Sequence, residues 1–250
     1  MRQPSPVGTK IDQIRKKSWR DRFLHYRYPP SEGAIDSWIR QFKKKDKEVA
    51  ARLLDSVEVV TRVQMEQAFK TLMGDIPGWH RTKATRSGTW RFVPYSFSSG
   101  ESGDQMIACF RQAMGLKQKY YDELFIFPHQ LPEARLTGDD TVVLVDDFAG
   151  SGNQAARSWN RLFKELVGGV GNVYLLVVAA TVDAQKEVRD KTEVQLLNHY
   201  NLTSADNFFS EDCIHFSAED KAAIFSYCEQ HFADEPYGYE RSGLVFVLQH

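Results

Sequence analysis

A run of apolar residues that ends at two adjacent carboxylates is the feature that most constrains the fold of this chain. The residues from Thr141 to Val145 are apolar or β-branched, Asp146 and Asp147 follow, and residues 148–152 are mostly small. Such an apolar run is typical of a strand buried on both faces of a parallel sheet. We therefore expect the acids at the carboxyl end of a strand, where open α/β sheets bind their ligands.

The segment after the acids indicates a site for phosphate. Gly150, Ser151 and Gly152 allow the backbone to turn its N–H groups inward, and a helical pattern starts near Asn153. Amides in such a turn, together with the N-terminal dipole of a helix, form a cradle for anions. Paired acids beside this cradle suit a phosphorylated sugar, because carboxylates hold its hydroxyls or Mg²⁺ while the amides hold its phosphate. The alternatives are a plain strand end with solvated acids and, disfavoured because the chain has no Gly-x-x-x-x-Gly-Lys-Ser/Thr, a Walker-type NTPase.

An earlier segment repeats the order of strand, small-residue loop and helix. Residues 90–97 are rich in aromatic and β-branched side chains, residues 98–103 are small or polar, and a helical pattern follows through Met106 and Met114. Either Ser102 or Asp104 can cap this helix. A second anion cradle in this place is what a diphosphate leaving group needs, although a plain turn explains the same pattern. The candidate residues of this second loop are Ser99, Gly100, Ser102 and Gly103.

The remaining patterns place both segments in one α/β sheet. Further strands are predicted at 121–127, 172–178, 194–197 and 244–248, and helices from 153, at 184–190 and at 217–231. This alternation predicts a mainly parallel sheet with helices on both faces. Three helices are predicted before it, at 31–42, 46–60 and 62–73. We therefore divide the chain into a basic arm with a helical part, residues 1–78, and an α/β domain, residues 79–250.

Composition limits the class of protein. The chain has 250 residues, of which 42% are hydrophobic and 26% are charged, as in an ordinary globular protein. No stretch of 18 apolar residues exists, so we expect no membrane span, and the N-terminus lacks the apolar region of a signal peptide. Three cysteines without metal-like spacing indicate reduced thiols and a cytoplasmic protein. The chain stops inside an apolar strand at His250, so we expect further residues to follow it.

The first thirty residues form a basic arm. They hold eight lysines and arginines against Asp12 and Asp21, with Trp19, Phe23, Tyr26 and Tyr28 interleaved. Basic and aromatic side chains together can bind nucleic acid through phosphate contacts and base stacking. The arm can equally be an amphipathic segment that packs its aromatics on the protein body. The second interpretation is favoured because no nucleic-acid-binding motif accompanies the arm.

The acidic stretch resembles the PRPP-binding motif of type I phosphoribosyltransferases, where PRPP is 5-phosphoribosyl 1-diphosphate. Residues 142–145 match the strand of that motif, Asp146 and Asp147 match its two acids, and Ser151 and Gly152 match its Thr-Gly. The resemblance implies catalytic roles and indirect metal contacts for the two acids. It also implies contacts to phosphate and ribose from the following loop, which comprises Phe148, Ala149, Gly150, Ser151, Gly152, Asn153 and Gln154.

The motif departs from the family pattern at two positions. Gly150 and Gln154 stand where the family commonly has threonine, so fewer side-chain hydroxyls are available to a phosphate. Type I phosphoribosyltransferases also carry a flexible catalytic hood before the acidic strand, which corresponds to residues 128–140 here. That correspondence makes His129 and Arg135 candidates for reaching pyrophosphate, with a solvated surface loop as the alternative.

The C-terminal segment adds a second resemblance. The stretch from Pro236 to Phe246 contains a Gly-Tyr segment before the last strand, Trp38 and Phe42 form a Trp/Phe pair, and Ser102 begins a Ser-Gly loop. Over residues 31–250 the chain is similar to the PRTase-CE family of bacterial conflict systems. This resemblance implies an effector of antiviral defence, including some retrons, encoded beside a reverse transcriptase and a non-coding RNA that would be its partners.

Three functions are compatible with these observations. The first is a glycosyltransferase-type enzyme that binds PRPP or a related phosphorylated nucleotide with Mg²⁺ and transfers or hydrolyses at ribose C1. The second is a non-catalytic module that senses such a nucleotide or binds a partner, and it is favoured by the two departures and by the lack of an obvious general base. The third is a nucleic-acid-binding scaffold built on the basic arm. The sequence indicates neither the acceptor nor the oligomeric state.

Overall fold

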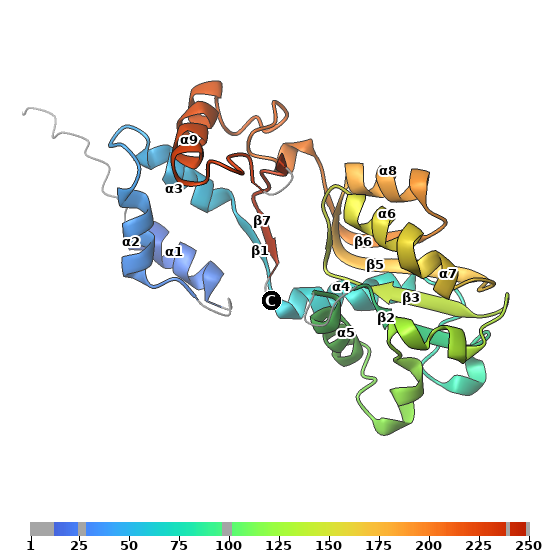
Figure 1. Ribbon diagram of the computed structural model, residues 1–250. Coiled ribbons are helices and arrows are strands. Elements are labelled where there is room, and N and C mark those ends of the chain that lie inside the picture. Colours follow the sequence, from blue (N-terminus) through green and yellow to red (C-terminus); the bar gives the residue numbers. More distant parts are fainter. Residues whose placement is uncertain (1–12, 25–28, 97–101, 239–240, 249–250) are drawn as a thin grey trace, which may run out of the picture. The chain divides into compact units, whose positions relative to one another are not determined.

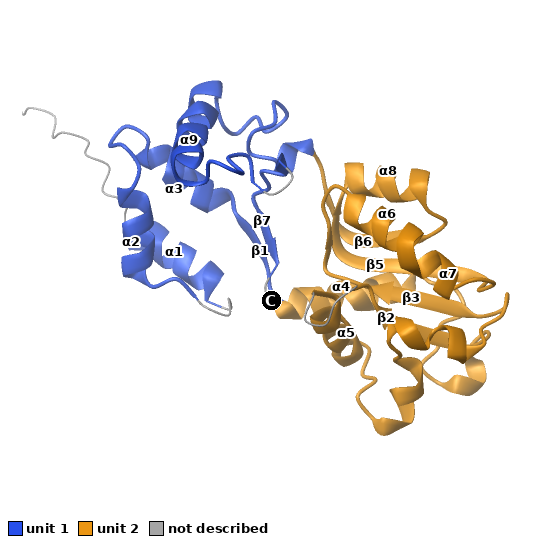
Figure 2. Cartoon of the chain, in the orientation of Figure 1, with its two compact units in different colours: residues 1–61, 204–250 blue, residues 62–203 orange. Residues whose placement is uncertain are grey.

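The computed structural model describes residues 13–24, 29–96, 102–238 and 241–248. The chain divides into two compact units, one made of residues 1–61 and 204–250 and the other of residues 62–203 (Figure 2). This division differs from the predicted boundary between residues 78 and 79. The difference has two causes: helix α4 (Arg62–Gly74) packs on the α/β sheet, and strand β7 (Phe246–Leu248) pairs with β1 (Glu58–Val60).

The unit of residues 62–203 contains a parallel five-stranded sheet, as the alternating pattern predicts. Its strands are β2 (Trp90–Pro94), β3 (Thr141–Val145), β4 (Phe148–Ala149), β5 (Asn172–Thr181) and β6 (Gln195–Leu202). Strand β3 lies between β2 and β5, strand β6 covers the other edge of β5, and every pairing is parallel. All the carboxyl ends of these strands therefore lie at one edge of the sheet.

Helices cover both faces of this sheet (Figure 1). One face carries α8 (Val182–Lys191) and a continuous helical segment made of α6 (Asn153–Ser158), a π-helical turn (Trp159–Phe163) and α7 (Lys164–Leu166). The other face carries α4 and α5 (Ser102–Ala113). This three-layer arrangement confirms the predicted α/β class.

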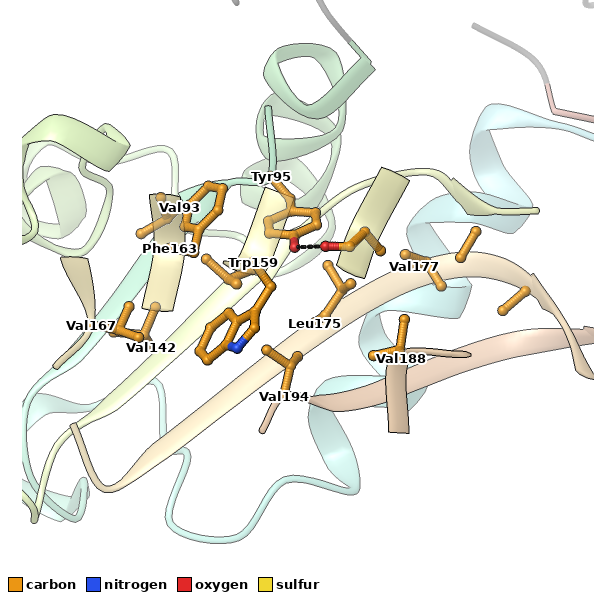
Figure 3. Close-up of a cluster of buried hydrophobic side chains, with 14 of the residues drawn as sticks. Val93, Tyr95, Val142, Trp159, Phe163, Val167, Leu175, Val177, Val188 and Val194 are labelled. Atoms are coloured by element: carbon orange, nitrogen blue, oxygen red, sulfur yellow. Dashed lines mark hydrogen bonds between the residues drawn. The ribbon is translucent and has the colours of Figure 1, made fainter. Parts of the chain in front are cut away.

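The core of this unit lies on both sides of the sheet. Beneath α6 and α8, Trp159 and Phe163 pack with aliphatic side chains of β3 and β5, such as Val142 and Leu175 (Figure 3). On the other face, the ring centroid of Phe110 lies 4.8 Å from that of Phe92 in β2 and 5.6 Å from that of Phe69 in α4. Aromatic burial of this kind is a large part of the stability of a domain.

Three predicted elements differ in the structure. The predicted strand at 121–127 is a 3₁₀ helix, η2 (Lys119–Leu124), because its buried side chains, Tyr121 and Leu124, recur every three residues instead of every two. The predicted helix at 46–60 ends at Ser56, and its last residues form β1. The predicted closing strand at 244–248 becomes β7 and pairs with β1 instead of completing the large sheet.

The unit of residues 1–61 and 204–250 is mainly helical. It contains α1 (Gln13–Phe23), α2 (Glu32–Arg40), α3 (Lys47–Ser56), the 3₁₀ helix η6 (Ser204–Asp206) and α9 (Ala218–His231), together with β1 and β7. Ser31 caps α2 by accepting a hydrogen bond from the amide of Ala34, and Ser217 forms a capping box with Asp220 at the start of α9. Trp19 and Phe42 are buried in its core.

The described part of the basic arm packs on the protein body, in agreement with the interpretation favoured from sequence. The indole of Trp19 is buried and donates a 2.6 Å hydrogen bond to Asp55. Arg15 binds the carboxylates of Asp55 and Glu48. The other described cations of α1 also meet acceptors within this unit: Lys16 meets Asp36, Lys17 meets Asp21, Arg20 meets Glu32, and Arg22 meets backbone carbonyls at the end of α3. Residues 1–12 lie outside the described part.

Two further findings concern the predicted cellular environment. Across the described residues, no helix combines the length and the apolar character that a membrane span requires. The three cysteines are free thiols, with Cys109 and Cys213 buried.

Candidate functional site

The acid pair interrupts a strand rather than ending it. Val145 pairs with Leu176, and three residues later Phe148 pairs with Ala179, so β3 and β4 follow one register along β5. The backbone ladder also continues through the acids, because the amide of Asp146 donates to Leu176 and the carbonyl of Asp147 accepts hydrogen bonds from β5. Strand β3 thus ends at Val145, as the sequence predicts, and the pairing with β5 resumes after the acids in β4, which the sequence does not predict.

A shared irregularity marks the level of the acids in both strands. The carbonyl of Asp147 accepts from two successive amides of β5, those of Val178 and Ala179, at 2.9 and 3.2 Å. The side chains of Val177 and Ala180 lie in the same core cluster although a regular strand would place them on opposite faces. At the level of the acids, the alternation of side chains between the two faces of the sheet is therefore reversed, both in β5 and in the β3–β4 segment. The pairing register between them is kept. Irregularities of this kind are frequent beside active sites, where they redirect a side chain.

Asp146 is a buried carboxylate that accepts hydrogen bonds from two donors. The residue is 9% exposed, and its Oδ1 atom accepts hydrogen bonds from the Ser102 hydroxyl at 2.7 Å and from the Asp147 amide at 2.9 Å. Burial raises the pKa of Asp146 well above its usual value, and the neighbouring charge of Asp147 raises it further. The two hydrogen bonds oppose this shift. Two carboxylates in such a setting favour a cation or a hydroxyl-rich ligand.

Tyr95, which follows β2, lies close to the same group. Its hydroxyl donates a 2.6 Å hydrogen bond to the carbonyl of Ala155 in α6, drawn as a dashed line in Figure 3. Burial raises the pKa of Tyr95, and the charge of Asp146 raises it further. The phenol therefore stays neutral and joins the end of β2 to the helix that follows the small-residue loop.

The small-residue loop is held against α8 by a close contact. Gly152 has a φ of +76°, and a Cβ atom at this position would lie 2.8 Å from the Cβ of Glu187 and 2.9 Å from the Cα of Ala184. Only glycine fits this backbone conformation and this contact. The amide of Asn153 donates to the Ser151 hydroxyl at 3.2 Å, which fixes the first turn of α6.

Thr181, at the end of β5, ties the loop to the next helix. Its hydroxyl donates to the carbonyl of Gly150 and accepts from the amide of Ala184 at 3.0 Å, so one side chain fixes the loop and caps α8. Sequence reasoning missed this role. The available signal was a threonine immediately before a helical pattern, which is the usual position of an N-cap.

The structure brings the end of the second loop to the acid pair. Ser102 and Gly103 are the first residues of α5, and a Cβ atom on Gly103 would lie 3.1 Å from the backbone of Tyr95. Because the Ser102 hydroxyl bonds to Asp146, the start of α5 and the acids form one cluster. Ser99 and Gly100, the other two candidates in this loop, lie outside the described residues.

Comparison with known proteins identifies the family of this chain. The family model of PRTase-CE matches residues 35–250. The chain belongs to the PRTase-CE family. No curated protein matches the chain. Among solved structures, the AQ2163 protein from Aquifex aeolicus matches with a TM-score of 0.38 and 13% sequence identity, over 78% of this chain and 87% of that chain.

In this PRTase-CE member, the segment expected to act as a catalytic hood is partly ordered by its own core contacts. It forms two 3₁₀ turns, η3 (Pro128–Gln130) and η4 (Pro132–Ala134), and Leu131 between them is buried. His129 stacks on Phe127 with ring centroids 5.9 Å apart, and Arg135 has a φ of +48°. That either residue reaches a diphosphate stays a prediction.

The hood segment ends at the amino end of β3, whereas the acids follow the carboxyl end of the same strand. There the buried Asp140 accepts hydrogen bonds from the amides of Thr89 and Thr137 at 2.6 and 2.7 Å. Burial alone would raise the pKa of Asp140, but these hydrogen bonds outweigh burial and lower it. Asp140 is thus a structural anchor at the amino end of β3.

The two acids suit a magnesium ion whose coordination is completed by water and substrate. They do not suit a metal that is held by protein side chains alone. Within the described residues, no group of three or more His, Cys, Asp or Glu side chains could enclose a metal ion. Mg²⁺ is commonly bound by one or two carboxylates, with waters and substrate phosphates completing its coordination. Asp146 and Asp147 supply that number of carboxylates beside the small-residue loop.

Proposed function

We propose that this chain binds PRPP or a related phosphorylated nucleotide at the acid pair and transfers or hydrolyses at its ribose C1. The observation that carries this proposal is the buried Asp146, which receives a hydrogen bond from Ser102 of the second loop. One carboxylate thereby links the two loops that a ligand with phosphate at one end and diphosphate at the other would need. Membership of the PRTase-CE family supports the same reading.

Each part of the site has a proposed partner on the ligand. The amides of residues 149–154 hold the 5′-phosphate, since they combine a glycine-containing turn with the start of α6. Asp146 and Asp147 hold the ribose hydroxyls. The start of α5, at Ser102 and Gly103, faces the diphosphate end, together with Ser99 and Gly100 of the same loop.

Mg²⁺ is the proposed cofactor. Asp146 and Asp147 would hold it directly or through water. Burial raises the pKa of Asp146 and the charge of Asp147 raises it further, so a cation at this place would favour the ionised pair. When bound, Mg²⁺ supplies charge neutralisation for the diphosphate.

The proposed reaction breaks the bond between ribose C1 and the diphosphate oxygen and forms a bond between C1 and an acceptor or water. The diphosphate leaves with the bonding electron pair, and the acceptor loses a proton. The transition state at a glycosidic carbon resembles an oxocarbenium ion. The contribution of this chain is then mainly to position the ligand and to surround the developing positive charge with Asp146 and Asp147.

A second candidate function is a non-catalytic sensor of the same ligand. Its specific support is that the Ser102 hydroxyl is already bound to Asp146, so it is engaged within the protein. The loss of threonine hydroxyls at Gly150 and Gln154 points in the same direction. In this reading, the ligand binds at the acid pair without reaction and changes how a partner binds.

Titration calorimetry tests the proposed ligand site. PRPP and nucleotides, each with Mg²⁺, are titrated into the wild type, the double variant Asp146→Asn/Asp147→Asn and the control Asp75→Asn, an exposed acid after α4. We expect binding by the wild type and the control and at least a tenfold loss in the double variant. Equal binding by all three proteins would contradict the site assignment.

A pyrophosphate-release assay separates the enzyme from the sensor. Release from PRPP that requires Asp146 and Asp147 supports the enzyme, whereas tight binding without release under any acceptor supports the sensor. Water and candidate bases, nucleotides and nucleic acids are supplied in turn as acceptors.

At the level of the cell, we propose a cytoplasmic effector of a bacterial antiviral system of the retron type, regulated by a reverse transcriptase and its non-coding RNA or DNA. Family membership is the support for this role, and it is an argument by analogy. The test is expression of the chain with and without its genomic neighbours. Toxicity that appears without the neighbours and disappears in Asp146→Asn/Asp147→Asn would support an enzymatic effector, and normal growth in every case would count against it.

A further inference from the structure

The unit of residues 62–203 has a basic surface of its own, and the cations of this surface have different partners from those of α1. It lies where the 3₁₀ helix η1 (Lys83–Thr85) meets the turn before η2. We call it the η1–η2 surface and define it by six residues: Arg81, Lys83, Arg86, Lys117, Lys119 and Tyr120. All of them belong to the unit of residues 62–203.

Direct contacts hold the two segments of this surface together. The Arg81 guanidinium donates to the Tyr121 hydroxyl at 3.1 Å and to the Gly115 carbonyl at 2.8 Å, and it lies 5.5 Å from the centre of the Tyr121 ring. Lys83 pairs with Glu123 at 2.9 Å. The cations before β2 and those before η2 therefore form one surface.

The arginines of this surface are held in place by neutral groups. Arg86 donates to the carbonyls of His80 and Arg81, each at 2.7 Å, and its guanidinium lies 4.9 Å from the centre of the Trp79 ring. Carbonyls and a phenol fix a guanidinium without cancelling its charge. On α1, in contrast, Arg15 and Arg20 meet carboxylates.

The surface also has excess positive charge. Lys117 and Lys119 are exposed, and no carboxylate of the described residues forms an ion pair with either of them. Of the two acids in η2, Asp122 pairs with Arg111, and Glu123 faces Lys83. Its pKa is lowered, first by the hydrogen bond from Lys83 and further by the charges of Lys83, Arg91 and Arg86. One carboxylate surrounded by several cations leaves the potential of the surface positive.

An exposed aromatic ring lies within this positive surface. Tyr120 is 61% exposed and meets the ring of Tyr121 edge to face, with centroids 5.0 Å apart. Lys119 precedes it directly in the chain. A large ring in water beside lysines and fixed guanidinium groups can stack a nucleobase while the cations meet the phosphates on either side.

We propose that the η1–η2 surface binds single-stranded nucleic acid, with one base on Tyr120 and backbone phosphates at Lys117, Lys119, Arg81 and Arg86. A single strand fits better than a duplex because its bases are free to stack. In addition, the surface is built from short 3₁₀ turns, which offer no long helix or ribbon for a groove. This binding is additional to the proposed ligand site.

Fluorescence anisotropy with the full chain tests this proposal. The probes are labelled single-stranded RNA and single-stranded DNA of one sequence, about 12 nucleotides long, and the matching duplex. Binding is measured between 50 and 200 mM salt, because phosphate contacts make affinity salt-dependent. The variants are Lys117→Gln/Lys119→Gln, Tyr120→Ala and Tyr120→Phe. The control, Lys17→Gln/Arg20→Gln on α1, removes the same charge where both cations already face carboxylates.

We expect the lysine variant to lower affinity and to reduce the salt slope by about 1.4, at ~0.7 per phosphate contact on a single strand. Tyr120→Ala should weaken binding at least about fivefold, whereas Tyr120→Phe should retain it. The control should stay within about twofold of the wild type. The ratio of RNA to DNA affinity then shows which of the two strands the surface prefers.

Three results would overturn the proposal. The first is no difference between the wild type and the lysine variant, and the second is a duplex bound as tightly as a single strand. The third is polyglutamate bound as tightly as nucleic acid, with no effect of Tyr120→Ala, which would mark a surface for acidic proteins. Circular dichroism of each variant confirms that folding is unchanged, which is expected because Tyr120 and both lysines are exposed.

Discussion

The buried carboxylate of Asp146 lowers the stability of the fold at neutral pH. Its pKa is raised by burial and by Asp147, so the folded protein binds a proton at this position more tightly than the unfolded chain does. The sign follows from linkage: the contribution of Asp146 to stability is fully present below its unfolded pKa and is lost as pH rises through the folded pKa. At neutral pH, Asp146 therefore weakens the unligated fold.

Replacing Asp146 with asparagine should therefore stabilise the free protein. We expect Asp146→Asn to raise the free energy of unfolding by about 1 kcal/mol at pH 7, the size of gain that relief of a strained functional site gives. Asparagine keeps the acceptor that Ser102 and the Asp147 amide require. Urea unfolding measures the change, and ligand titration of the same sample should show lost binding. A clear loss of stability would contradict the raised pKa.

Asp140 carries the opposite pKa shift and predicts the opposite response. Hydrogen bonds from Thr89 and Thr137 lower its pKa despite burial, so its stabilising contribution is present at neutral pH and is lost as pH falls through the folded pKa. We expect Asp140→Asn to cost about 2 kcal/mol at pH 7, since hydrogen bonds to a charged acceptor are lost. Urea melts should show the gap between wild type and variant closing towards about pH 3. A gap that widens in acid would refute this assignment.

At the level of elements, the contact between the small-residue loop and α8 predicts a steep effect of one methyl group. Gly152→Ala adds a Cβ 2.8 to 2.9 Å from atoms of Glu187 and Ala184, in a backbone conformation that L-residues rarely adopt. We expect a loss of about 3 kcal/mol in stability and weakened phosphate binding. Gly74→Ala, at a position with open space, is the control and should change stability by less than about 1 kcal/mol. Thermal melts of both variants measure the difference.

The helices and strands of this chain also show which elements can be predicted from a single sequence. The apolar runs of β3 and β5 predict buried parallel strands because their patterns are local, and Ser217 predicts the start of α9 in the same way. Strand β1 was missed because three residues carry no periodicity and their partner lies at the other end of the chain. Residues 121–127 were assigned as a strand because aromatic content favours strands, yet their spacing in the fold is that of a 3₁₀ turn.

The candidate site likewise has features that the sequence predicts and features that it does not. The sequence predicts where the acids and both loops lie, because strand ends and small-residue turns are local signals. It does not predict that the Ser102 hydroxyl meets Asp146, or that Thr181 holds Gly150, since these contacts join distant segments. Nor does it predict that β4 resumes after the acids, because two residues are too few to show alternation.

For the molecule as a whole, the division into units predicts that residues 62–203 fold alone. All the described residues of the candidate site lie in this segment, and its sheet is complete without either end of the chain. We expect a fragment of residues 62–203 to unfold cooperatively by circular dichroism and to bind phosphate-containing ligands as the full chain does. A fragment without a cooperative transition would show that the other unit is required for its stability.

The pairing of β1 with β7 has a consequence for biosynthesis. Glu58 leaves the ribosome early, whereas its partner Phe246 is made only after the whole α/β sheet has been translated. Domains fold as units while the chain is being made. Residues 62–203 can therefore close on the ribosome while the first helices still await their last strand. Because the residues made last are still inside the ribosome, a stall shortly before residue 245 would leave a nascent chain with a finished candidate site and an unfinished neighbouring unit.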